Sequence, residues 1–148
     1  MKYTTAELGR IFILRLEDGD LIPDIIEEFA KKKNIKAALV NFLGGADEKS
    51  KVVVGPEDGT AEIPRPMITQ LRGTSEALGV GTLFSNEEGV AKLHLHSAFG
   101  REDKTVTGCS RKGVKIWHIG EVIIQELLNT DACRKVDSQL GFELLNIK

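Results

Sequence analysis

The stretch GVAKLHLHSAFG at residues 89–100 carries the clearest structural signal in the sequence, because its apolar and polar residues alternate. Leu93 and Leu95 occupy one set of alternate positions, and His94 and His96 occupy the other. Successive side chains of a β-strand point to opposite faces. The stretch therefore predicts a strand with one apolar face and one polar face that carries two histidines.

Segments with similar strand signals recur on both sides of this stretch. They are rich in β-branched, apolar or alternating residues and are bounded by glycine, proline or aspartate, as is typical of short strands. The segments are 10–17, 35–45, 49–56, 67–85, 105–109, 114–117, 132–137 and 142–147. The run 35–45 is apolar on both faces until it reaches two glycines, which predicts a central strand.

Glycine and proline predict where the strands are interrupted. Residues 56–66 contain three of the four prolines, and we expect them to form a long loop. Gly73, Gly79 and Gly81 fall within 67–85, and they predict bulges or a close approach of two backbones in a curved sheet.

Two segments have a helical rather than a strand period. Apolar residues of 22–30 recur every three or four positions, which predicts a helix with Asp20 as its N-cap. Residues 120–128 are predicted to form a second helix, with Glu121 in its first turn. The whole pattern predicts an α+β fold in which a predominantly antiparallel, curved sheet is combined with two main helices.

Length and composition limit the fold and its partners. A chain of 148 residues has the usual size of one domain, so we expect a single domain over 1–148. The 20 Lys and Arg against 22 Asp and Glu give a net charge of −2, which supplies no basic field for nucleic acid. The apolar runs are too short to cross a bilayer, so no membrane partner is expected. Two cysteines and the lack of a signal-peptide pattern predict a cytoplasmic protein.

The two histidines of 89–100 are candidate metal ligands. Residues i and i+2 of a strand project from the same face, so His94 and His96 can converge on one ion. A turn near 100–103 returns the chain, and the two registers centred there place Cys109 opposite either His94 or His96. Cys109 would then be a third ligand, and two nitrogens with one thiolate suit zinc. The same spacing is compatible with a polar strand face exposed to water.

Other polar residues could complete or assist such a site. Three protein ligands leave one position of a tetrahedron open, as in catalytic zinc sites, whereas structural sites usually have four. His118 could be a fourth ligand, although its place before the predicted second helix favours a capping or surface role. Glu76 and Glu121 are weak candidates for a general acid or base, and a solvated carboxylate or a helix-dipole effect explains them more simply. Cys133 is predicted to be a small core residue.

The order of these segments resembles the plant and prokaryote conserved domain, the PCC or PPC domain family of unknown function. The resemblance covers essentially the whole chain and rests on RIFILRLEDGD, KNIKAALVNFLGG, LRGTSEAL, KLHLHSAFG, TGCSRKG, GEVIIQEL and CRKVDSQLGFELL. In the family the HLH strand is commonly followed by Gly-Gly-His-Leu. Thr107-Gly108-Cys109-Ser110 stands at that motif, so His94 and His96 match the family and Cys109 replaces the third histidine.

The resemblance implies a homotrimer with the histidine strand near the subunit interface. It also implies a fold related to that of acetolactate decarboxylase. His94 and His96 resemble the zinc-binding histidines of that enzyme. We therefore expect one zinc ion per chain in a metal-binding protein of unassigned cellular role. Two alternatives stay open: a zinc-dependent lyase or hydrolase acting on a small oxygenated acid, and a DNA-binding or transcription-associated regulator. The second is the family's usual label, but this slightly acidic chain has no AT-hook.

Overall fold

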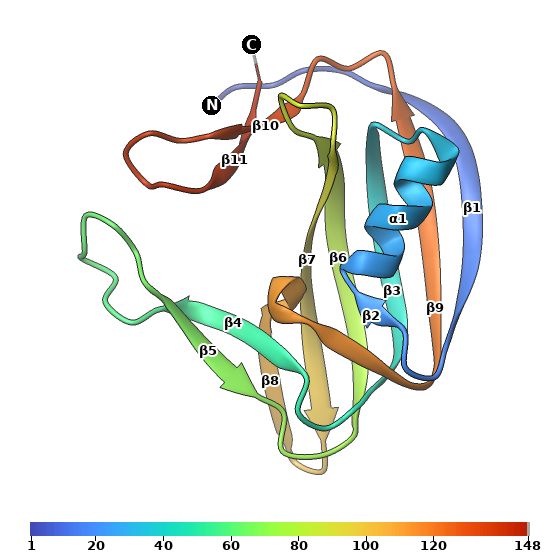
Figure 1. Cartoon of the computed structure of the whole chain (residues 1–148), viewed down its shortest axis with the longest axis vertical. Coiled ribbons are helices and arrows are strands. Elements are labelled where there is room, and N and C mark those ends of the chain that lie inside the picture. Colours follow the sequence, from blue (N-terminus) through green and yellow to red (C-terminus); the bar gives the residue numbers. More distant parts are fainter. Residues whose placement is uncertain (148) are drawn as a thin grey trace.

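A curved antiparallel sheet of nine strands forms the body of the protein (Figure 1). The structure is a computed structural model of the chain, and it describes residues 1–147. Eight strands lie in the order β1-β9-β3-β6-β7-β8-β4-β5, and β2 pairs with β9. Their bounds are β1 (Glu7–Glu17), β2 (Leu21–Ile22), β3 (Ala37–Ala46), β4 (Lys51–Pro56), β5 (Pro66–Gln70), β6 (Ser75–Ser85), β7 (Ala91–Arg101), β8 (Lys104–Cys109) and β9 (Val114–Leu128).

The predominantly antiparallel sheet is confirmed, as is the central position of the strand predicted at 35–45. That strand is β3, which lies between β9 and β6. The predicted strand at 89–100 is β7, where buried and exposed residues alternate as expected. The loop predicted at 56–66 is observed at residues 57–65, which connect β4 to β5 without a helix or strand of their own, while Pro56 ends β4 and Pro66 begins β5.

One α-helix, α1 (Asp24–Lys33), covers one face of the sheet. It buries Ile26 and Ala30, which belong to the predicted apolar stripe. Phe29 packs edge-on against Phe12 of β1, with the two ring centroids 5.3 Å apart. The face beneath the helix is therefore the hydrophobic core of the protein.

The start of α1 differs from the prediction. Asp20 does not cap the helix, because Leu21 and Ile22 first pair with β9 as β2 and delay the helix by one turn. Pro23 stands at the N-cap position, and the Asp20 carboxylate instead accepts a hydrogen bond from the Glu17 N–H at 2.8 Å. The residue therefore stabilises the turn between β1 and β2.

The second helix predicted at 120–128 is wrong, because these residues belong to β9. Val122, Ile124 and Glu126 are buried while the residues between them are more exposed, which is the two-residue period of a strand. Pairing with β1 on one side and β3 on the other holds this segment extended. Tertiary pairing thus overrides the short helical pattern. Among residues 1–147, no helix is long and apolar enough to span a membrane.

Two glycines of β6 allow it to lie tightly against β7, as the glycine pattern predicts. A Cβ atom on Gly81 would lie 2.6 Å from the His94 carbonyl oxygen and 2.8 Å from the Leu95 Cα atom. On Gly79 it would lie 2.4 Å from the Ser97 Oγ atom. Gly73 instead precedes β6 and lies against the Arg101 side chain. Close backbone approach is thus confirmed for the two glycines beside the histidine strand.

The face opposite α1, here called the open face, is crossed by one row of paired residues. The row runs across six strands through Ile13, Ile123, Asn41, Val80, His96 and Cys109. Large apolar side chains on this face are exposed, among them Leu43, Leu78 and Val80. The histidine pair therefore lies at the end of an apolar surface that no element of the described chain covers.

The chain after β9 forms a separate two-stranded sheet of β10 (Cys133–Val136) and β11 (Glu143–Asn146). An isolated bridge between Asn86 and Arg134 joins this C-terminal hairpin to the chain just after β6. Figure 1 shows it on the same side of the molecule as the β4–β5 hairpin. The two hairpins thus flank the edge where β8 ends.

Candidate metal centre

The pairing of β7 with β8 brings three metal-ligating side chains together. His94 and His96 project from one face of β7, and Cys109, the last residue of β8, pairs directly with His96. This is one of the two registers that the sequence leaves open. The short 3-10 helix η1 (Ser110–Lys112) then turns the chain away, and a hydrogen bond between Ser97 Oγ and Ser110 Oγ of 3.1 Å fixes that turn.

The ligand atoms of these three residues, here called the His-His-Cys cluster, lie close together. The Nε2 atoms of His94 and His96 are 3.0 Å apart, and their rings are nearly perpendicular at 86°. The two nitrogens and the Cys109 sulfur all lie within 4.8 Å of one another. Tetrahedral zinc would place such atoms about 3.3 to 3.6 Å apart. The spacing is therefore close to that of a metal site.

Burial differs within the cluster. Cys109 is only 2% exposed, whereas both histidines are exposed on the open face. The pKa of His94 is lowered to about 4, first because neighbouring groups desolvate the ring and then because His96, Arg134 and Arg111 oppose its positive charge. At pH 7 the His94 ring is neutral and offers a lone pair.

The donor chemistry also fits zinc. Thiolate and imidazole together are a common zinc donor set, and they are less suited to magnesium or calcium, which prefer oxygen. Two Nε2 atoms that face each other can share only one hydrogen atom, whereas a metal ion can accept a lone pair from each ring. The residues present thus fit the metal that the sequence predicts.

Two pockets open beside the cluster. The first, here called the arginine pocket, has a volume of about 470 Å³ and contains His94 and Cys109 in its wall. Its other main lining residues are Glu27, Lys92, Arg111, Arg134, Phe142 and Glu143. The second, of about 550 Å³, contains His96 and Cys109 and is walled by prolines of the β4–β5 hairpin. A ligand in either pocket would lie next to the cluster.

The sequence as a whole matches a known family profile. The profile of the Plants and Prokaryotes Conserved (PCC) domain matches residues 3–128, which is most of the chain. The chain belongs to the PCC family. No curated protein was found to match this PCC-domain sequence.

Solved structures share the fold of this PCC domain over nearly its whole length. A metal-containing protein from Archaeoglobus fulgidus is 25% identical with a TM-score of 0.82, and the match covers 99% of both chains. A plant- and prokaryote-conserved protein from Pyrococcus horikoshii is 23% identical with a TM-score of 0.84, covering 100% of this chain and 99% of that one. A chain from Bacteroides thetaiotaomicron, named as a candidate DNA-binding protein, is 17% identical with a TM-score of 0.77 and coverages of 97% and 99%.

The structure does not bring the two carboxylate candidates to the cluster. Glu76 lies on β6 four residues from Val80, the partner of His96, which is about 13 Å along the strand. Glu121 lies on β9, three strands away from β7 and so about 14 Å across the sheet. Neither residue lines the two pockets beside the cluster.

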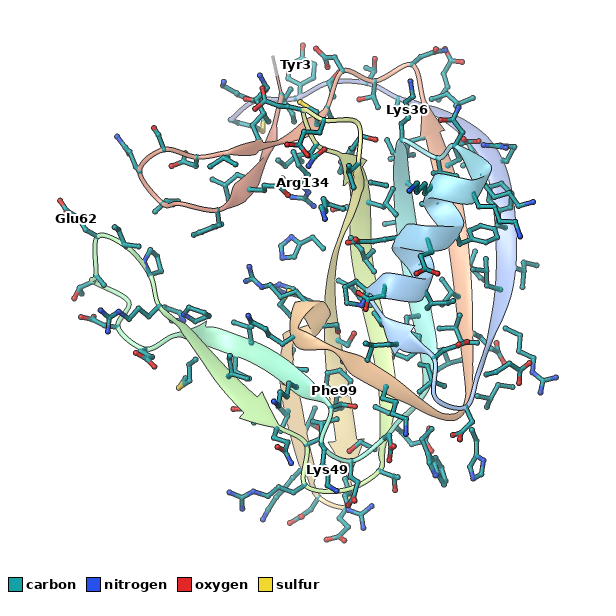
Figure 2. The ribbon with its side chains drawn as sticks, in the orientation of Figure 1. Tyr3, Lys36, Lys49, Glu62, Phe99 and Arg134 are labelled. Carbon is teal, nitrogen blue, oxygen red and sulfur yellow. The ribbon has the colours of Figure 1, made fainter. Side chains whose placement is uncertain are left out.

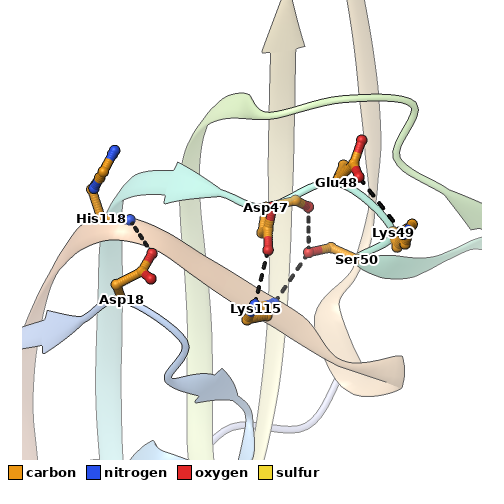
Figure 3. A network of polar contacts seen from close by, with 7 residues as sticks. All are labelled: Asp18, Asp47, Glu48, Lys49, Ser50, Lys115 and His118. Carbon is orange, nitrogen blue, oxygen red and sulfur yellow. Dashed lines mark hydrogen bonds and ion pairs between the residues drawn. The ribbon is translucent and has the colours of Figure 1, made fainter.

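His118 does not belong to the cluster, and it lies in a network of polar contacts with Asp18 (Figure 3). It is not at a helix terminus, as the sequence suggests, but in a bulge of β9 with a left-handed φ of 61°. Its N–H donates to Asp18 Oδ1 at 2.8 Å. In the same region the Lys115 ammonium, bonded to Asp47 at 3.0 Å, lowers the pKa of that carboxyl. These contacts hold the bulge between β2 and β3.

Sequence reasoning missed the residues of the C-terminal hairpin. Arg134 and Phe142 reach the arginine pocket only because β10 and β11 fold back against the end of β6 (Figure 2). Arg111 lies two residues after Cys109, and this proximity in the sequence is the one signal that could have indicated its place in the pocket. Cys133, predicted to be a core residue, is half-buried and lines a different pocket beside Glu126.

Proposed function

We propose that this PCC-domain protein binds one zinc ion per chain through His94, His96 and Cys109. The observation that carries the proposal is the convergence of their three ligand atoms within 4.8 Å. The Archaeoglobus relative, 25% identical, is described as metal-containing, which supports a metal at this fold. When bound, zinc would supply a Lewis-acid centre at the open face.

The protein is further proposed to act in the cytoplasm as a homotrimer with the cluster near the subunit interface. The support from this chain is the exposed apolar surface that extends from the cluster across the open face. Leu78 and Val80 are 61% and 57% exposed on that surface. Large exposed apolar patches are typical of subunit interfaces.

A second candidate function is that of a zinc-dependent lyase or hydrolase. The pockets of about 470 and 550 Å³ beside the cluster favour it, because a substrate needs a cavity at the metal. Glu76 and Glu121 would need to come from another subunit to serve as proton carriers. Regulation through DNA is the third hypothesis, and the net charge of −2 gives it no electrostatic support.

Metal analysis of protein purified without a histidine tag tests the zinc proposal. We expect about one zinc per chain in the wild type and less than roughly 0.2 in His94→Ala, since two remaining ligands bind weakly. The His118→Ala variant is the matched control and should keep its zinc.

Two variants of Cys109 separate loss of the ligand from loss of the fold. Cys109→Ser should lose zinc, and Cys109→His should regain it, because imidazole replaces one competent zinc ligand with another. Wild-type protein with less than 0.2 zinc per chain, unchanged in His94→Ala, would refute the proposal.

A further inference from the structure

Arg134 is a buried cation whose hydrogen-bonding capacity is largely unused by residues 1–147. The residue is only 6% exposed, yet its Nη2 atom donates one hydrogen bond, to Thr82 Oγ1 at 3.0 Å. Its guanidinium lies over the Phe84 ring, 5.8 Å from the centroid. Arg134 makes no ion pair with any residue of 1–147. Most of its five N–H donors are left for another partner.

Arg134 lines the arginine pocket. Among residues 1–147, no buried side-chain nitrogen or oxygen lacks a hydrogen-bond partner. The guanidinium nitrogens of Arg134 that make no protein hydrogen bond are therefore not completely buried. Thr82, which holds the guanidinium, pairs with His94 across β6 and β7. The same contact thus places Arg134 beside the His-His-Cys cluster.

A second arginine lines the same pocket. Arg111 follows the cluster in η1, and its side chain has neither a hydrogen bond nor an ion pair within the described chain. Both arginines line the same pocket as His94. Two guanidinium groups without carboxylate partners thus lie near one proposed metal ion.

Two of the three acidic side chains that line the pocket, Glu27 and Glu143, are already engaged, and the third is Asp24. Glu27 accepts a hydrogen bond from the Leu93 N–H at 2.9 Å and lies 3.8 Å from the Lys92 ammonium. Glu143 accepts a hydrogen bond from the Asn86 amide at 3.2 Å. Burial lowers the pKa of Arg134, and the nearby Glu143 and Cys109 offset only part of that effect. The three acidic side chains equal Lys92, Arg111 and Arg134 in number, so the pocket has no net positive charge. What it offers an anion is two guanidinium groups that form no ion pair with any described residue.

We propose that Arg134 and Arg111 bind the carboxylate of a small acid whose second oxygen group reaches the metal held by the His-His-Cys cluster. The planar guanidinium matches a carboxylate through two parallel hydrogen bonds, which a point charge cannot reproduce. A pocket of about 470 Å³ has room for a small dicarboxylate but not for a macromolecule. The contact between the second oxygen group and a metal rests on the proposed zinc site. The binding of the carboxylate depends only on the arginine side chains described above.

Calorimetric titration with succinate tests the proposal, with zinc-loaded and zinc-free protein measured separately. Succinate should bind the loaded protein, and the uncharged succinamide should not. Arg134→Gln and Arg111→Gln should each weaken succinate binding roughly ten- to hundredfold, since each removes charged hydrogen bonds. Arg15→Gln, an exposed arginine on β1, is the matched control and should bind as the wild type does.

If the buried Arg134 is needed for folding, the Arg111→Gln variant still tests the proposal, because Arg111 is exposed. Arg134→Lys adds a second check: it keeps the charge, and its binding should still fall because the planar fork is lost. Equal succinate affinity in Arg111→Gln and wild type would overturn the proposal, as would equal binding of succinamide. Binding of inorganic phosphate with no binding of succinate would also overturn it. Zinc content is measured on the same samples, so a failed zinc site is recognised independently of a failed anion site.

Discussion

The two faces of the sheet differ in what completes them. On one face, α1 covers the strands and the side chains beneath it are fully buried, such as Ile26 and Ile124. On the open face, no element of the described chain covers Leu78 or Val80, which are more than half exposed. Because side chains alternate along each strand, every strand contributes residues to both faces. One face is thus completed within the chain, and the other is available for a partner subunit and a ligand.

The position of the His-His-Cys cluster follows from this difference. A histidine on the covered face would be fully buried and would need a fixed hydrogen-bond partner. On the open face, His94 and His96 remain accessible while Cys109 is buried at the end of β8, between β7 and β4. The arrangement combines a rigid thiol with two accessible imidazoles. A metal bound there would be held by the fold and still be open to a ligand.

The largest expected effect concerns assembly. A Leu78→Asp substitution places a charge on the open face, and we expect a mass of three chains to fall to that of one in light scattering. Ile63→Asp is the control, because Ile63 is exposed in the β4–β5 connection and should leave the mass unchanged. A wild-type protein that is already monomeric would show that the open face is not a subunit interface.

The next effect compares core and surface directly. In the Leu78→Asp background, Ile26→Ala should lower the free energy of unfolding by about 2–5 kcal/mol, because it opens a cavity beneath α1. Val80→Ala should cost about 0.5 kcal/mol or less in that background, since Val80 is exposed in one chain. Chemical denaturation measures both values. Equal losses would mean that the open face is buried within the single chain.

These expectations also show how far sequence reasoning reaches. The period of two places Leu95 in the core and His94 and His96 outside it, and the turn limits Cys109 to two registers. Both steps use local geometry, and the structure bears out their placement. The arginine pocket depends instead on the C-terminal hairpin folding back to β6, a contact between Arg134 and Thr82 that no local pattern encodes. The strand at 120–128 was missed for the same reason, because its neighbours β1 and β3 decide its conformation.

A smaller effect is expected where β6 lies against the histidine strand. Gly81→Ala would bring a methyl group within 2.6 Å of the His94 carbonyl oxygen, so the two backbones must separate. We expect a loss of about 1–3 kcal/mol in unfolding free energy and weaker zinc retention, because His94 moves with its strand. Gly59→Ala is the control, since a Cβ there meets nothing within 4 Å. Normal stability and full zinc content in Gly81→Ala would show that the close packing is not needed.

The smallest expected effect concerns the one carboxylate on the covered face. Glu126 is 5% exposed and accepts three hydrogen bonds from Arg10, two from the guanidinium at 2.6 and 2.7 Å and one from the N–H at 3.1 Å. These bonds lower the pKa of Glu126 in the folded protein. Their contribution to stability is therefore complete above the unfolded-state pKa of about 4.3 and is lost as the pH falls through the lower folded-state value.

Denaturation curves measured from pH 7 to pH 3 test this linkage. Glu126→Gln should be less stable than the wild type at pH 7, and the difference should shrink below about pH 4.3 as the wild-type carboxylate is protonated. Arg10→Gln should show the same convergence, because it removes the donors that lower the pKa. A stability difference that stays constant down to pH 3 would mean that the Arg10–Glu126 pair does not set the acid sensitivity of the covered face.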